Sequence, residues 1–255
     1  MIDNDKDARI KRFQREFDAN DTLTKHMVAV MRNHSGKLKL RGTIAEKDLD
    51  LAVTAMFSKA EKTYEAILEL CARGFGEDAT TLLRGNVNLM INLYYILAED
   101  SVSRGSAFIA HGHSEQAKYL RLAHRELPED LTRLDWEKIE KLAAEWRAVT
   151  IETKAEKAKQ GYHYNVGYRF YSSIEHSNAW ALSRYVTSWD EVGPKIGGEP
   201  SDTFVNIALP HNFWVMANVF LKFCAHFKIE EPEIEKDLDN YWHQLFHDPR
   251  SDEAL

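Results

Sequence analysis

The chain has 255 residues, of which 44% are hydrophobic, so it is long enough to bury one substantial core. Its net charge of −7 argues against a protein that coats nucleic acid non-specifically, because such affinity comes mostly from lysine and arginine on phosphates. The charged N-terminus lacks the apolar run of a secretory signal, and the apolar segment Phe213–Phe227 falls short of the roughly 20 residues that span a bilayer.

We therefore expect a cytoplasmic protein without a membrane partner, in which Cys71 and Cys224 are buried free thiols. Helical periodicity recurs along the chain, whereas no alternating strand pattern exceeds a few residues. This predicts an all-α fold of seven or eight helices in one bundle-like domain. We assign residues 1–42 to an N-terminal helical extension, 43–248 to the bundle and 249–255 to a frayed tail.

The first predicted helix covers residues 5–33, with Asn20 and Asp21 as a break or cap inside it and Ser35-Gly36 at its end. Thr43, with Glu46 three residues later, predicts a capping box at the start of the next helix, which runs to Arg73-Gly74. A helix over residues 77–98 is apolar on most sides, which is typical of the centre of a bundle.

Glycines weaken the helical pattern over residues 101–126, where Gly105 and Gly112 interrupt it. An amphipathic helix from Trp136 is expected to continue to Gln160, and Gly161 to stop it. The segment 188–201 is rich in glycine and proline and is predicted to be a loop. Two prolines suit first-turn positions of the last two helices: Pro210 and Pro232.

Reactive side chains gather in the stretch Tyr162–Trp189, which combines aromatic and polar residues. As a helix from about Val166 onward, this stretch places an arginine, a serine, a histidine and a tryptophan on one face. These residues are Arg169, Ser173, His176 and Trp180.

Several common site motifs are absent from the sequence. No histidine has a glutamate three residues before it, as di-iron bundles require, and the sequence has no Cys-x-x-Cys pair and no phosphate-binding glycine loop. We therefore expect no cofactor and no metal. An alternative is a metal site at His243 and His247, four residues apart and followed by Asp248.

The spacing of Arg169 and His176 is similar to that of helical ribonucleases of the HEPN type, which carry an arginine, four to six residues and a histidine on one helix. There an imidazole moves protons at the RNA 2′-hydroxyl and the leaving oxygen, while a guanidinium holds the phosphate, without a metal. Arg104 and His111 have the same spacing, so the spacing alone carries little weight. The structural alternative is that Arg169 pairs with a carboxylate and His176 is an interior histidine.

Two ordered blocks resemble the bacterial family known as domain of unknown function 5677. The first block is Ala66–Ile96, with a Leu-Leu-Arg run that ends at Arg84, and the second runs from Tyr168-Arg169 to His176-Ser177. The resemblance covers about residues 51–189. It implies an α-helical, HEPN-like domain with a polar site where Arg84 and position 88 meet Arg169 and His176.

The sequence departs from the family at Asn88, where the pattern has glutamate. The loss of that carboxylate removes an expected partner of a buried arginine. We therefore expect either a changed site or compensation by another acid, for which the candidates are Glu65, Glu69 and Glu175.

The leading hypothesis is a metal-independent ribonuclease of a bacterial stress or phage-defence system, such as a toxin–antitoxin pair, with Arg169 and His176 as catalytic residues. RNA is the expected partner, no DNA partner is expected, and a homodimer is implied by analogy. Supporting roles fall to Arg84, Asn88, Tyr168, Ser172, Ser173 and Glu175. The rival is a non-catalytic binding or regulatory module with a polar Arg/His pocket, walled by Tyr94, Tyr95, Tyr162, Tyr164 and Tyr171.

Overall fold

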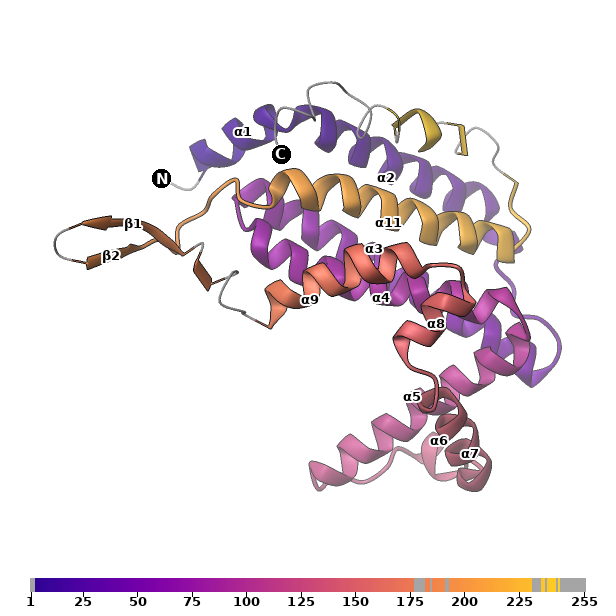
Figure 1. Cartoon of the computed structure of the whole chain (residues 1–255). Helices are drawn as coiled ribbons and strands as arrows, with labels where there is room; N and C mark the ends of the chain where they lie inside the picture. Colours follow the sequence, from indigo (N-terminus) through magenta and orange to yellow (C-terminus); the bar gives the residue numbers. More distant parts are fainter. Residues whose placement is uncertain are drawn as a thin grey trace. The chain divides into compact units, whose positions relative to one another are not determined.

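The computed structural model describes residues 3–176, 182–183, 185–190, 193–230, 235–236, 238–241 and 243. The fold is all-α, as the sequence predicts (Figure 1). The chain divides into two compact units. One consists of residues 1–37, 57–90 and 162–255, and the other of residues 38–56 and 91–161. No helix in the described part of the chain is long and apolar enough to cross a membrane.

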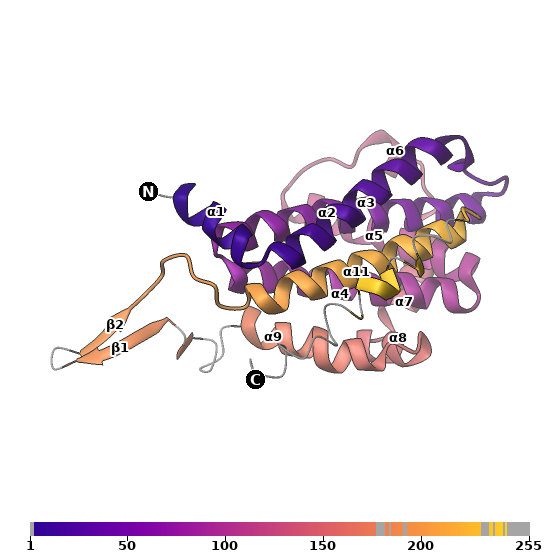
Figure 2. The ribbon, with the colours of Figure 1, turned by 90° about the horizontal axis from the view of Figure 1, so that it is seen from above.

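The first unit is a set of helices that come from distant parts of the sequence. Helix α2 and helix α11 run side by side in both views (Figures 1 and 2). The unit contains α1 (Asp3–Arg12), α2 (Gln14–His34), a short 3-10 helix (Ser35–Lys37), the second half of α3 (Ile44–Arg73), the first part of α4 (Gly76–Ala98), a π-helix (His163–Tyr168), α9 (Arg169–Glu175) and α11 (Val205–His226).

Asn20 lies fully buried within α2, so the predicted break at Asn20-Asp21 is wrong. Its side-chain NH₂ group donates to the carbonyls of Glu16 and Leu209, and its backbone carbonyl accepts from the hydroxyl of Tyr64. These hydrogen bonds offset the cost of burying the polar side chain. Asn20 therefore joins α2 to α3 and α11 instead of ending a helix.

Pro210 also differs from its predicted place, because it lies inside α11 and not in its first turn. Pro210 is buried together with most of the apolar residues of α11. A proline inside a helix leaves one backbone carbonyl without its helical donor, a cost that packing on several sides offsets here. Pro232 lies outside the described residues.

The second unit packs α5 (Ser101–Leu122) against α7 (Trp136–Arg147). Gly105 lies within α5, where a Cβ atom would come 2.8 Å from the Cα of Leu49. The glycine therefore permits close packing and does not interrupt the helix, contrary to the prediction. The remaining elements of this unit are the first half of α3, the last part of α4, α6 (Glu129–Thr132) and α8 (Ile151–Lys157).

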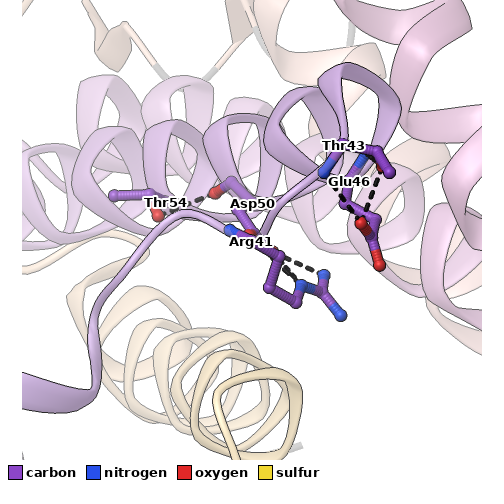
Figure 3. A network of polar contacts seen from close by, with 5 residues as sticks. All are labelled: Arg41, Thr43, Glu46, Asp50 and Thr54. Carbon is purple, nitrogen blue, oxygen red and sulfur yellow. Dashed lines mark hydrogen bonds and ion pairs between the residues drawn. The ribbon is translucent and has the colours of Figure 1, made fainter.

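A polar network fixes the start of α3 (Figure 3). The backbone N–H of Glu46 donates to the hydroxyl of Thr43 at 3.2 Å, and the Glu46 carboxylate accepts from the Thr43 N–H at 3.0 Å, which confirms the predicted capping box. Arg41 donates to the buried carboxylate of Asp50 from its backbone N–H at 2.8 Å and from Nε at 2.9 Å. The loop before α3 is thereby fastened to the first turns of the helix.

Two boundaries in the second half of the chain were predicted wrongly. Thr150 caps a new helix, because its hydroxyl accepts from the N–H of Thr153 at 3.2 Å, so α7 and α8 are separate. The predicted loop at 188–201 begins with an antiparallel hairpin of β1 (Val186–Asp190) and β2 (Gly193–Ile196). β2 begins at Gly193, which has a φ of +131°, a conformation that favours glycine.

Candidate functional site

The predicted organising helix occupies a different range from the one expected. Helical structure begins at Gly161, passes through the π-helix His163–Tyr168 and ends with α9 at Glu175. Gly161 therefore starts this helix and does not stop the preceding one. The stretch as far as Trp189 is not one helix, because β1 begins at Val186, and Trp180 lies outside the described residues.

An arginine-centred cluster joins α4 to this helix. The guanidinium of Arg84 donates from Nε to the hydroxyl of Ser172 and from Nη2 to the hydroxyl of Tyr168, both at 2.9 Å. Nη1 forms an ion pair with Oε2 of Glu175. The Tyr168 ring lies below the guanidinium carbon at 4.7 Å, a cation–π geometry. Three residues therefore hold the guanidinium of Arg84 by four contacts.

Glu175 supplies the acidic partner that Asn88 cannot provide. Of the three acids considered as replacements, Glu69 bonds to Lys6 and Arg73 instead, and Glu175 reaches Arg84. Asn88 is half-buried one helical turn after Arg84. The arginine and glutamate are only 22% and 31% exposed, so their charges attract more strongly than those of a surface pair.

Arg169 and Ser173 do not join this cluster. Ser173 donates its hydroxyl to the carbonyl of Phe170 at 2.7 Å, which engages the group locally. The Arg169 side chain is exposed and makes no hydrogen bond or ion pair with the described residues. His176 is 73% exposed at the C-terminal end of α9, with Nε2 at 4.0 Å from the Glu175 carboxylate.

A second cluster, which we call the histidine cluster, is formed by His163, Tyr171, His211 and Trp214. The Tyr171 hydroxyl is hydrogen-bonded to Nδ1 of His211, and the Tyr171 side chain is fully buried. The His163 ring stacks on Trp214 with 3.9 Å between centroids. Burial lowers the pKa of His211 to about 4, and burial together with the neighbouring His211 lowers the pKa of His163 to about 4. Both imidazoles are therefore neutral at pH 7.

Two hollows adjoin the histidine cluster and share two lining residues, Val166 and His211. The inner pocket has a volume of about 100 Å³ and is lined by Val87, Tyr162, His163, Val166, Gly167, His211, Trp214 and Val215. The outer groove is more open, has a volume of about 520 Å³ and is lined by Asn165, Val166, Arg169, Phe170, Ile207 and His211.

The comparisons with known proteins give one match. The model of a family of unknown function, DUF5677, matches residues 50–193, more than half of the chain. The chain belongs to this family. No curated protein and no solved structure matches it.

The DUF5677 match contains the whole Arg84 cluster and the π-helix, but it ends before α11. His211 and Trp214 therefore complete the hollows from outside the matched segment. Sequence reasoning had not selected these two residues. The available signal was a polar His211-Asn212 pair inside an otherwise apolar helix, since buried polar side chains in such a run need hydrogen-bond partners.

The five tyrosines predicted to line one pocket of this DUF5677 chain do not lie around a single pocket. Tyr162 lines the inner pocket, Tyr171 lies behind His211, and Tyr164 stacks on Tyr168 at 5.5 Å. Tyr94 and Tyr95 line neither hollow, and Tyr95 packs against Trp146 in the second unit. His247 and Asp248, considered above as metal ligands with His243, lie outside the described residues.

The two clusters differ in what they offer chemically. The Arg84 cluster uses its donors on protein acceptors, so its main effect is to hold α9 against α4. The outer groove is lined by the exposed Arg169, by apolar side chains and by His211, whose imidazole is neutral. Such a mixture of apolar surface and few polar groups is typical of small-molecule sites.

Proposed function

We propose that the chain is a binding module that takes a small organic anion in the outer groove. The observation that carries the proposal is the position of Arg169, which lines the groove and has no hydrogen-bond or ion-pair partner among the described residues. A carboxylate or phosphate would form a charge-assisted hydrogen bond with it. Val166, Phe170 and Ile207 would cover the apolar body of the ligand.

The volume supports a small-molecule occupant. A groove of about 520 Å³ lies within the range of roughly 300–1,000 Å³ that is common for such sites. The net charge of −7 does not favour anions over the surface as a whole. A bound anion would be held at this place by local contacts and not by the overall field.

The test is a fluorescence titration with 8-anilinonaphthalene-1-sulfonate, an anion with an aromatic body, at low salt. Arg169→Met keeps the length of the side chain and removes its charge, and we expect it to weaken binding by about tenfold or more. Arg125→Met is the matched control, because Arg125 is exposed in the other unit. Equal affinity of Arg169→Met and the wild type would refute the proposal.

A second candidate, which we also propose for testing, is the metal-independent ribonuclease. It is favoured by Arg169 and His176, which are both exposed and lie seven residues apart, about two turns of helix, so that they share one side of α9. Glu175 lies beside the imidazole and is itself held by Arg84. His176 would move the proton and Arg169 would hold the phosphate.

The ribonuclease candidate is tested by incubating tRNA and total RNA with the purified protein in EDTA. Cleavage that is lost in both His176→Ala and Arg169→Met, but kept in Arg125→Met, would support it. The analogy with HEPN nucleases also implies a homodimer, so cleavage per protein should fall on dilution. Absence of cleavage by the wild type would leave the anion-binding proposal as the better supported function.

A further inference from the structure

The inner pocket shares Val166 and His211 with the outer groove and is more enclosed. Its volume of about 100 Å³ is smaller than the roughly 150 Å³ of an apolar cavity that holds benzene. It therefore has room for a branched alkyl group or part of a ring. Gly167 forms part of its wall, and a Cβ atom there would lie 3.6 Å from the two methyl groups of Val87, which is ordinary contact distance.

The walls of the inner pocket are unfavourable for a charged group. They include two aromatic residues, Tyr162 and Trp214, and three aliphatic residues, Val87, Val166 and Val215. The imidazoles of His163 and His211 stay neutral because burial disfavours their charged forms. Hence no formal charge in this wall compensates a buried anion or cation, and burying one without a partner is costly.

The outer groove and the inner pocket thus differ in charge. The guanidinium of Arg169 lies at the outer groove, while the inner pocket offers apolar surface and neutral imidazoles. The Tyr171 hydroxyl is bonded to Nδ1 of His211 and fixes the ring at the junction of the two hollows. The Tyr171 hydroxyl has no other hydrogen-bond partner among the described residues, so its proton can be donated only to Nδ1 of His211. In that arrangement the neutral imidazole carries its own proton on Nε2.

We infer that the ligand is a carboxylate or phosphate ester with an uncharged tail no larger than a single ring, whose acid group binds Arg169 and whose tail enters the inner pocket with its end, as a branched alkyl group or one edge of a ring. This inference rests on the proposed anion-binding function and adds the class of ligand. The tail decides specificity, because the inner pocket admits small apolar groups and excludes charged ones. The acid decides orientation, because a single cation lines the outer groove.

The probes are phenylacetate, 3-phenylpropanoate and 4-phenylbutanoate, which differ in the spacing between acid and ring. Phenyl phosphate tests the phosphate form of the acid, and 3-phenylpropanol lacks the charge. Isothermal titration calorimetry of the wild-type protein should show one alkanoate bound more tightly than the others and no measurable binding of the alcohol. The rank of phenyl phosphate against the alkanoates identifies which acid the outer groove prefers.

Gly167→Ala is the decisive variant, because the added methyl group lies against Val87 and reduces the inner pocket. We expect it to weaken the best phenylalkanoate by about tenfold, and to leave acetate, which has no tail, unaffected. Gly85→Ala is the matched control, since a Cβ at that helical glycine meets nothing within 4 Å. Circular dichroism of both variants shows whether they are folded.

The two proposals fail in different ways. If the phenylalkanoates bind with full dependence on Arg169 but with no effect of Gly167→Ala or of tail length, the inference about the tail is wrong and the anion-binding function stands. If neither the phenylalkanoates nor 8-anilinonaphthalene-1-sulfonate depend on Arg169, the anion-binding function itself is wrong. If 3-phenylpropanol binds as tightly as the acids, the inferred role of the acid is wrong.

Discussion

The guanidinium of Arg84 and the carboxylate of Glu175 form an ion pair that joins α4 to the last turn of α9. The same guanidinium bonds to Ser172 and Tyr168, so one side chain holds three residues of the opposite helix. These three residues lie on one face and Arg169 on another. The cluster thereby sets the angle at which Arg169 is presented to the outer groove.

Arg84→Met should lower the free energy of unfolding by about 1–3 kcal/mol, because it leaves the half-buried Glu175 carboxylate and two hydroxyls without their cation. Urea denaturation followed by circular dichroism measures the change. Arg73→Met is the control, since the Arg73–Glu69 pair is about half exposed on both sides and should contribute under about 1 kcal/mol. Equal losses in the two variants would show that the cluster has no special structural role.

The all-α fold and several helix boundaries were predictable because they depend on local patterns. The capping box of Thr43 and Glu46, and the end of α3 before Gly74 at a φ of +82°, are properties of a few neighbouring residues. Asn20, Gly105 and Pro210 were misread for the opposite reason. Their effects depend on partners far away in the sequence, and without those partners each residue indicates a break in the helix.

Tyr171→Phe should destabilise the protein by about 1–2 kcal/mol, although it removes a single oxygen atom. The lost hydroxyl leaves Nδ1 of the buried His211 without this partner. Thermal unfolding of the variant is compared with that of Tyr119→Phe, a substitution of a tyrosine that is 62% exposed. A melting temperature for Tyr171→Phe no lower than that of the control would contradict the hydrogen bond to His211.

The free energy of unfolding should decrease as the pH is lowered from about 6.5 to about 4. The pKa of His163 and of His211 is about 4 in the folded protein, and unfolded histidines titrate near 6.5. In this window the unfolded state binds more protons, so acidification favours unfolding by at most about 1.4 kcal/mol per pH unit for each histidine, and less for the partly exposed His163. Below pH 4 this contribution levels off.

The pH dependence is measured by urea denaturation at pH 7, 6 and 5 for the wild type and His211→Gln. The variant should show a smaller loss of unfolding free energy between pH 7 and pH 5, whatever its stability at pH 7. His176→Gln controls for the loss of an exposed imidazole. Identical slopes for all three proteins would indicate that His211 is not kept neutral by burial.

Two glycines of α5 should respond in opposite directions to the same substitution. Gly105→Ala should cost about 1–3 kcal/mol, because the new Cβ would lie 2.8 Å from the Cα of Leu49. Gly112→Ala should stabilise the helix by about 0.5–1 kcal/mol, because a Cβ there meets nothing within 4 Å. Chemical denaturation of both variants is the measurement, and a stabilised Gly105→Ala would refute the close packing of Leu49.

The candidate site was predictable only in part. The sequence indicated that Arg84 would meet the second block, and the structure shows the contacts with Tyr168, Ser172 and Glu175. It also grouped Arg169 with His176, whereas the hollow that contains Arg169 is completed by His211. His211 comes from a helix about 40 residues later in the chain, and helix periodicity within one segment carries no information about such a neighbour.

The π-helix gives this region an unusual dependence on chain length. A π turn hydrogen-bonds each residue to the fifth one along, so it takes more residues per turn than an α turn, in which each residue advances the helix by about 100°. The six residues His163–Tyr168 therefore cover about the rotation that five residues cover in an α-helix. Deleting one of them would allow an ordinary α-helix and would keep α9 on its present face, but it would remove part of the wall that this segment gives to the inner pocket. Homologous chains that are one residue shorter here should therefore keep the Arg84 cluster and differ in what the inner pocket admits.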